Sequence, residues 1–179
     1  MAEVLTQDEA SAGLSQLVAD ILRRVGNPEE LALVGIRRGG QPIAEHIADL
    51  IEKTTNVRVP IGSVDITLYR DDAPAPLPNP RIGRTDVPFD VRSKKIVLVD
   101  DVLHTGRTVR AAMHALLDFG RSRAILLAVL VDRDGRELPI QPDFVVKTIE
   151  VAPDQQVEIF TENNQFRAVV SDRTSNELL

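Results

Sequence analysis

The chain has 179 residues, of which 43% are hydrophobic and 27% charged, and its formal net charge is −6. This composition predicts a single globular domain over residues 1–179. The absence of cysteine excludes disulfides and thiolate metal sites, and the acidic balance argues against a general nucleic-acid coat. The N-terminal stretch lacks a signal-peptide pattern and no apolar run is long enough to cross a bilayer, so we expect a cytoplasmic protein without membrane contact.

Hydrophobic spacing predicts helices that alternate with buried strands. The first helix begins at a capping box of Thr6 and Glu9 and stops at Gly26-Asn27-Pro28. Buried strands are predicted at 31–36, 96–100, 124–132 and 144–149, helices near 42–51 and 109–117, and further strand material at 57–70, 157–160 and 166–170. This order indicates an α/β fold with a central, mostly parallel sheet flanked by helices.

Residues 71–90 contain five of the eleven prolines and little periodicity, which predicts a flexible binding loop or lid. Polar, charged loops follow three of the buried strands, at 37–40, 100–108 and 132–136. In a parallel sheet, ligands bind at the carboxyl ends of the strands. We therefore expect these three loops to meet at one ligand site.

The segment VDDVLHTGRTV carries the strongest chemical signal. Asp100 and Asp101 end a buried run, and paired carboxylates there require a cation or a hydroxyl-rich ligand. The turn Thr105-Gly106-Arg107-Thr108 leads into a helix, where backbone N–H groups and hydroxyls bind phosphate; alternatively, Thr105 or Thr108 is an ordinary N-cap. A phosphate beside a cis-diol or a metal describes a ribose 5-phosphate.

The turn Arg37-Arg38-Gly39-Gly40 suits a second anion such as pyrophosphate, since it combines positive charge with close backbone approach. No glycine-rich segment ends in Gly-Lys-Ser/Thr, and no G-x-G-x-x-G follows a strand. A P-loop site and a dinucleotide site are therefore unsupported.

VLVDDVLHTGRTV resembles the phosphoribosyl pyrophosphate (PRPP) motif of type I phosphoribosyltransferases. VDITLYRDD (64–72), the VGI-x-x-x-G turn (34–40) and VLVDRDGRELPI (129–140) resemble one branch of that family, the PyrR proteins, which regulate pyrimidine operons and act as uracil phosphoribosyltransferases. The resemblance covers nearly the whole chain. It implies a type I phosphoribosyltransferase fold with a flexible active-site loop at 71–90 and a small hood at 150–179.

The resemblance also implies roles for individual residues. Asp100, Asp101 and Arg38 would carry catalysis, with Mg²⁺ held at the two acids through ligand or water. Arg133 and the backbone near Val157 would border uracil, whereas His104 would be a variable loop position. The implied substrate-binding residues are Arg38, Gly39, Gly40, Arg70, Arg81, Arg84, Asp100, Asp101, Val102, Leu103, His104, Thr105, Gly106, Arg107, Thr108, Arg133 and Val157.

The function implied by the resemblance is transfer of a phosphoribosyl group from PRPP to uracil, giving UMP and diphosphate, together with UMP-dependent control of the pyrimidine operon through its leader mRNA. Arg136 matches a position that RNA-binding members use, and Gln141 stands where they tend to have another arginine. Two alternatives remain: a non-catalytic UMP-sensing RNA attenuator, and a phosphoribosyltransferase with vestigial regulation. The resemblance also implies that the chain forms a homodimer or a larger homo-oligomer.

Overall fold

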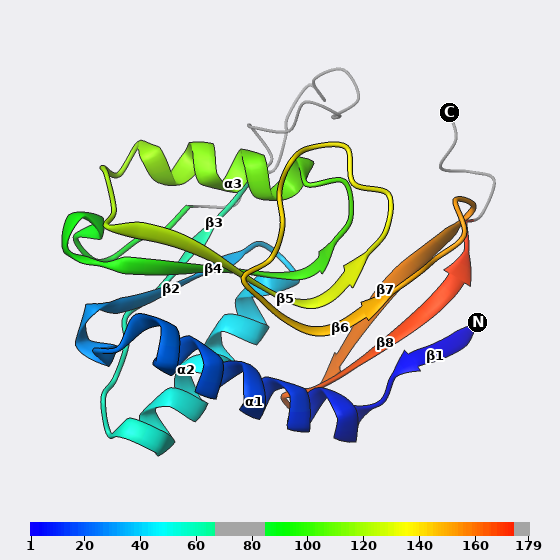
Figure 1. The fold of residues 1–179 in the computed structure, drawn as a ribbon, viewed down its shortest axis with the longest axis horizontal. Coiled ribbons are helices and arrows are strands. Elements are labelled where there is room, and N and C mark those ends of the chain that lie inside the picture. The colour runs from blue at the N-terminus through cyan, green and yellow to red at the C-terminus, as the bar shows by residue number, and fades with distance from the viewer. Residues whose placement is uncertain (67–84, 174–179) are drawn as a thin grey trace.

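The central sheet is five-stranded and entirely parallel, in the order β3-β2-β4-β5-β6 (Figure 1). The computed structural model describes residues 1–66 and 85–173. The strands are β3 (Ile61–Val64), β2 (Leu31–Ile36), β4 (Lys95–Leu103), β5 (Ala124–Arg133) and β6 (Phe144–Ile149). Strand β2 and residues 96–99 of β4 are buried throughout, which explains their unbroken apolar sequences.

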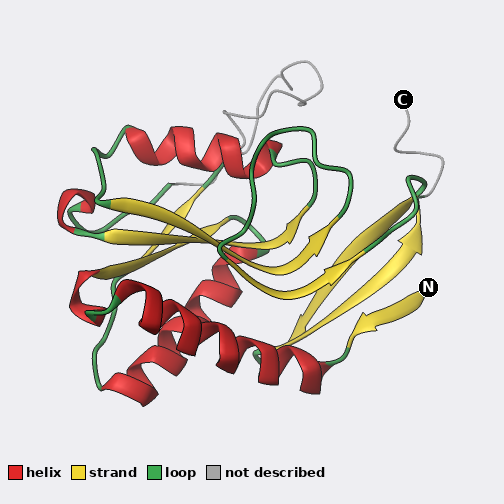
Figure 2. Ribbon diagram, viewed as in Figure 1, coloured by secondary structure: helices red, strands yellow, loops and turns green. Residues whose placement is uncertain are grey.

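Helices cover both faces of this sheet (Figure 2). Helices α1 (Gln7–Val25) and α2 (Gly40–Thr55) lie on one face, and α3 (Arg107–Leu117) lies on the other. Two aliphatic clusters result, one between α1, α2 and the sheet and one beneath α3. Short 3-10 helices at Pro28–Glu30 and Val91–Ser93 precede β2 and β4. The predicted α/β architecture is confirmed.

A second, antiparallel sheet of three strands lies beside the first, in the order β1-β8-β7. It consists of β1 (Ala2–Leu5), β7 (Gln155–Glu162) and β8 (Gln165–Asp172). The sequence predicted the β7–β8 pair but not β1, whose four residues have only one buried side chain. Strand β1 exists because it pairs with β8, so this sheet joins the two ends of the chain.

Strand β4 extends further than the apolar run that predicted it. It continues through Asp100 and Asp101 to Leu103, and it pairs with β5 as far as Leu103 and Asp132. The two acids therefore lie within a strand, where successive side chains point to opposite faces of the sheet. This alternation decides what each acid can reach.

The predicted flexible loop at 71–90 falls mostly outside the described residues, and so do Arg70, Arg81 and Arg84. Asp86 forms an isolated antiparallel bridge with Ser63 at the edge of β3. In residues 1–66 and 85–173, no helix has the length and apolar character needed to cross a membrane.

Helix α1 begins at the predicted capping box of Thr6 and Glu9. Thr6 Oγ1 accepts the backbone N–H of Glu9 at 3.2 Å, and Glu9 Oε2 accepts the N–H of Thr6 at 2.9 Å. Replacing Thr6 with alanine is expected to lower the free energy of unfolding by about 1 kcal/mol, because one N-terminal N–H loses its acceptor. Urea denaturation measures this loss, and Ser15→Ala, on the same helix, is the control; equal midpoints for both variants would contradict the cap's contribution.

Candidate functional site

A cavity of about 360 Å³ lies at the carboxyl end of β4, where that strand passes into α3. Its described lining residues are Asp100, Val102, Leu103, His104, Thr105, Gly106, Thr108, Val109, Glu137 and Arg173. Seven of these belong to the predicted substrate-binding set. The structure thus brings one acid and most of the 105–108 loop into a single cavity, at the sheet edge where parallel α/β proteins bind ligands.

Two helices that start beside this end of β4 have glycine as their N-cap residue. The N-cap of α2 is Gly39 and the N-cap of α3 is Gly106, which has a φ of 91°. Because glycine has no side chain, neither N-cap offers the acceptor that Thr6 supplies to α1. Free N–H groups at a helix start bind anions, so both helix ends are suited to phosphate groups.

The alternative that Thr105 or Thr108 is an ordinary N-cap does not describe α3. The N-cap residue is Gly106, and the Thr105 hydroxyl oxygen accepts the backbone N–H of Arg107, the first residue of α3, at 3.3 Å. Thr105 and Thr108 both line the cavity. Their hydroxyls are therefore placed to add donors to the N–H groups of the helix start.

Asp100 is a buried carboxylate whose environment disfavours its charge. Its side chain is 5% exposed, and Oδ1 accepts the backbone N–H of Asp101 at 3.0 Å. Burial is the main reason that the pKa of Asp100 lies well above its usual value, and the neighbouring charge of Asp101 raises it further. A ligand with hydroxyl donors or a cation in the cavity would favour the ionised form.

Asp101 points to a different loop. Its carboxylate lies directly against Gly39, so that a Cβ added to Gly39 would overlap it. Oδ1 of Asp101 also accepts the N–H of Val102 at 2.8 Å, which fixes the carboxylate beside the start of α2. The acid pair therefore lies between the two helices with glycine N-caps. Asp100 lines the cavity at the start of α3, and Asp101 contacts the turn before α2.

The α2 turn carries the residues predicted to bind diphosphate. Gly40 is buried against the strand, since a Cβ there would overlap the carbonyl oxygen of Val99. Arg38 is exposed, and its peptide bond with Arg37 is cis. Arg37 donates from Nε to the Ser63 hydroxyl at 3.0 Å, which attaches the turn to β3. Arg38 is the arginine of this turn that faces solvent.

The carboxylates of this site are suited to Mg²⁺ only when a bound ligand supplies the remaining oxygen atoms. No group of three or more His, Cys, Asp or Glu side chains suited to a metal occurs in the described ranges. Asp100 and Asp101 offer carboxylate oxygens, and Mg²⁺ is commonly held by one or two carboxylates together with substrate oxygens and water. The two acids therefore fit an ion that arrives with a phosphorylated ligand.

The segment RELPI, residues 136–140, supports the 105–108 loop from behind. The backbone N–H groups of Glu137 and Leu138 both donate to the carbonyl oxygen of Thr105, at 3.0 and 3.1 Å. The Arg107 guanidinium pairs with the Glu137 carboxylate at 2.6 Å. The loop therefore has an ordered wall, which reduces the cost of fixing it around an anion.

Arg136 lies between this wall and the end of β5. Its guanidinium pairs with Asp132 at 2.5 Å and donates to the carbonyl oxygens of Ile140, at 2.7 Å, and of His104. The role of Arg136 in RNA binding stays a prediction. Its contacts within the chain tie the loop after β5 to the loop after β4.

Arg133 is buried, at 4% exposure, and it donates to the carbonyl oxygens of Asp134, Val151 and Gln155. These bonds connect the end of β5 to the segment that leads into β7. Val157 on β7 is partly buried and packs against the larger aliphatic cluster. The predicted contacts of both residues with uracil remain predictions.

His104 lines the cavity next to Gly135, whose φ of 95° brings its backbone against the imidazole. Partial burial lowers the pKa of His104 below its usual value, and the charges of Arg133 and then Arg173 lower it further. The ring is therefore neutral near pH 7.

Three residues that line the cavity were absent from the predicted set: Val109, Glu137 and Arg173. Glu137 belongs to the RELPI motif, which indicated the family and no ligand contact. Arg173 follows β8 and reaches the cavity because the second sheet stands beside the first. No local pattern around Arg173 pointed to this position.

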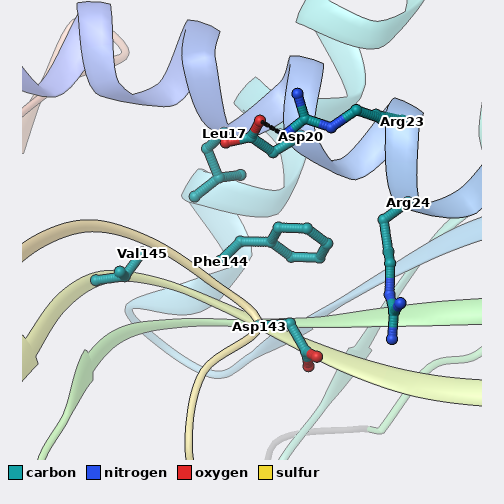
Figure 3. A pocket seen from close by; sticks show the side chains of 7 residues that line it. All are labelled: Leu17, Asp20, Arg23, Arg24, Asp143, Phe144 and Val145. Atoms are coloured by element: carbon teal, nitrogen blue, oxygen red, sulfur yellow. Dashed lines mark hydrogen bonds and ion pairs between the residues drawn. The ribbon is translucent and has the colours of Figure 1, made fainter.

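A larger cavity, of about 580 Å³, lies at the opposite end of the central sheet (Figure 3). It is formed by the last turns of α1 and the first residues of β6, and its lining residues are Leu17, Asp20, Arg23, Arg24, Asp143, Phe144 and Val145. Asp20 pairs with Arg23 at 2.6 Å, and Asp143 accepts the N–H of Leu127 at 2.8 Å. These charges serve contacts within the chain, and the cavity is at the amino ends of the strands, away from the acid pair.

Comparison with known proteins identifies the family. Residues 2–166 match the phosphoribosyl transferase domain. The protein from Roseiflexus sp. strain RS-1 named bifunctional protein PyrR is 48% identical over 155 residues, which cover 87% of this chain and 85% of that protein. The PyrR of Deinococcus radiodurans is 46% identical over 158 residues, covering 88% and 86% respectively.

Solved structures agree at the level of the fold. The hypoxanthine phosphoribosyltransferase of Trypanosoma cruzi superposes with a TM-score of 0.71 at 17% identity, over 94% of this chain and 95% of that one. A purine phosphoribosyltransferase from Pyrococcus horikoshii gives a TM-score of 0.61 at 21% identity, over 82% and 89%. These matches show the type I phosphoribosyltransferase fold, and together with the sequence matches they establish that the chain belongs to the PyrR family of phosphoribosyltransferase-domain proteins.

Proposed function

We propose that the chain transfers the phosphoribosyl group of PRPP to uracil, forming UMP and diphosphate. The observation that carries the proposal is the acid pair at the end of β4, set between two helices that begin with glycine. PRPP has a phosphate and a diphosphate on either side of a ribose diol. Two anion-binding helix ends with carboxylates between them suit that arrangement.

In the proposed reaction, N1 of uracil forms a bond with C1 of the ribose while the bond from C1 to the diphosphate oxygen breaks, and the N1 proton is lost. Asp100 binds the ribose hydroxyls and lies near the positive charge that develops on the sugar. The N–H groups at the start of α3 hold the 5-phosphate, and the α2 turn with Arg38 holds the diphosphate. Mg²⁺ would be held by Asp100 and Asp101 together with oxygens of PRPP, and it would supply positive charge at the leaving diphosphate. No residue is assigned as the base for the N1 proton.

Uracil as the acceptor base is supported by the DITLYRDD and VDRDGRELPI segments, which resemble PyrR rather than purine or orotate enzymes. The test is to incubate the protein with PRPP, Mg²⁺ and labelled uracil, with Asp100→Asn/Asp101→Asn as the control. UMP formed by the native protein and lost in the control is the expected result. No UMP from the native protein would overturn the enzymatic proposal, and faster use of hypoxanthine or orotate would overturn the choice of base.

We also propose that the chain regulates pyrimidine genes by binding their leader RNA when UMP occupies the cavity. The word "bifunctional" in the names of the similar proteins supports a second activity. A site that binds its product can signal through that product, since ligand and RNA affinities are thermodynamically linked. A gel shift with the organism's own pyrimidine leader should show tighter binding with UMP present. RNA affinity that does not respond to UMP would contradict the sensor model.

We further propose that the protein acts as a homodimer in the cytoplasm. Leu117 and Phe119, at the end of α3, are 61% and 41% exposed, which leaves an apolar surface suited to a partner. Sedimentation at increasing concentration is expected to give twice the mass of one chain. A monomer at every concentration would contradict this assembly.

A further inference from the structure

The cavity beside Asp100 needs more positive charge than the predicted residues supply. A phosphoribosyl ligand brings negative charge into it, and the acids in the lining are Asp100 and Glu137, of which Glu137 is already paired with Arg107. His104 also lines the cavity, but its lowered pKa leaves the imidazole neutral near pH 7. Among the described lining residues, Arg173 is the one permanent cation.

The other arginines near the cavity are engaged elsewhere. Arg107 pairs with Glu137, and Arg136 pairs with Asp132. Arg133 is buried and donates to backbone carbonyl oxygens. Each of these side chains holds part of the wall in place, so none is as available to a ligand as the exposed Arg173.

The backbone of Arg173 is held in position by the second sheet. Its N–H donates to the carbonyl oxygen of Asp154 at 2.8 Å, next to the last pair of the β7–β8 ladder, Gln155 with Asp172. The Gln155 side chain donates to Asp172 Oδ1 at 3.0 Å. Arg133 donates to the carbonyl oxygen of Gln155 at 3.0 Å, which connects this corner to β5. Because the backbone at Arg173 is already ordered, binding of an anion by its side chain does not require this segment to be ordered first.

We propose that Arg173 is a substrate-binding residue whose guanidinium pairs with a phosphate group of the phosphoribosyl ligand. The second sheet is then part of the site, because it supplies a cation that the central sheet lacks. The two helix starts would bind the ligand through N–H groups, and Arg173 would add a side-chain cation from the wall of the cavity. The inference rests on the proposed function, since it assigns a further contact to the same ligand.

The experiment measures binding of UMP, diphosphate and uridine to the native protein, Arg173→Gln and Arg173→Lys by calorimetry. Arg167→Gln is the matched control: it removes an arginine from β8, the strand that Arg173 follows, where the guanidinium carbon lies 4.3 Å from the centre of the Phe160 ring. Arg173→Gln is expected to weaken UMP or diphosphate binding roughly tenfold, as for a lost hydrogen bond to a charged group, and to leave uridine unaffected. Arg173→Lys should recover part of the loss, and Arg167→Gln should bind like the native protein.

Comparison of the three ligands shows which phosphate group Arg173 contacts. Loss confined to UMP places Arg173 at the 5-phosphate, loss confined to diphosphate places it at the leaving group, and both support the inference. Anion affinities within about twofold of native, or an equal loss for uridine, would overturn it, since a charged contact must discriminate by ligand charge. A native protein that binds none of these ligands would instead defeat the proposed function. Thermal denaturation of each variant verifies folding.

Discussion

Replacing Asp100 with asparagine is expected to abolish most UMP formation while making the free protein more stable. Asparagine keeps the shape of the side chain and the Oδ1 acceptor that binds the N–H of Asp101. It removes a charge that is proposed to face the ribose in the transition state, and such losses lower rates by about 10²–10³-fold. It also removes a carboxylate that is buried beside another carboxylate.

The gain in stability has a defined dependence on pH. Because the pKa of Asp100 is raised in the folded protein, the unfolded chain ionises this group first as pH increases. At pH values below the ordinary carboxyl pKa of about 4, the group is protonated in both states and asparagine gains nothing. As pH rises through the raised pKa of the folded state, the native protein loses stability that Asp100→Asn retains.

Urea denaturation near pH 5 and near pH 7.5 measures this difference. The variant Asp100→Asn should be more stable than the native protein by a larger margin at the higher pH. The difference should reach about 1–2 kcal/mol, which is typical of a single stabilising substitution. Asp154→Asn is the control, because that carboxylate is exposed. An Asp100→Asn variant that is less stable than the native protein at both values would show that the charge is compensated in the free protein.

The sequence predicted the strands that coincide with short, largely apolar runs. Strands β2 and β6 have the predicted boundaries, although only β2 is buried throughout, because such a run between charged and proline-containing segments indicates a strand. Strand β1 could not be found this way. Its pairing partner, β8, is about 165 residues away in the chain, and only the tertiary fold brings the two together.

The sequence predicted which residues belong to the candidate site, but it could not predict where their side chains point. The resemblance implied that Asp100 and Asp101 act together at one phosphoribosyl ligand, directly or through Mg²⁺. Because β4 continues through both residues, their side chains alternate, and one reaches the α3 cavity while the other meets Gly39. Arg173 was not predictable at all, since its place depends on the β7–β8 register and on the contact between two sheets.

Alanine substitutions of the two neighbouring glycines at the start of α2 should have different effects. One should lower stability, and the other should impair the site. A Cβ on Gly39 would overlap the Asp101 carboxylate, whereas a Cβ on Gly40 would overlap the carbonyl oxygen of Val99, in the backbone of β4. A side chain can rotate away, but a central strand cannot. Gly40→Ala is therefore expected to cost about 1–3 kcal/mol of stability, as overpacking usually does.

Gly39→Ala should leave the fold intact and impair the site. Gly39 has helical backbone angles, φ −69° and ψ −34°, that alanine adopts readily, and the substitution reduces the freedom of the unfolded chain. The methyl group must nevertheless displace Asp101, whose Oδ1 accepts the N–H of Val102 at 2.8 Å. We expect the KM for PRPP to rise at least about tenfold with little change in the KM for uracil, because displacing Asp101 weakens the binding of PRPP in the ground state. Steady-state kinetics with thermal denaturation measures both properties. An unchanged KM for PRPP in a folded Gly39→Ala protein would mean that the position of Asp101 does not matter for the substrate, which would remove one of the two acids from the proposed site.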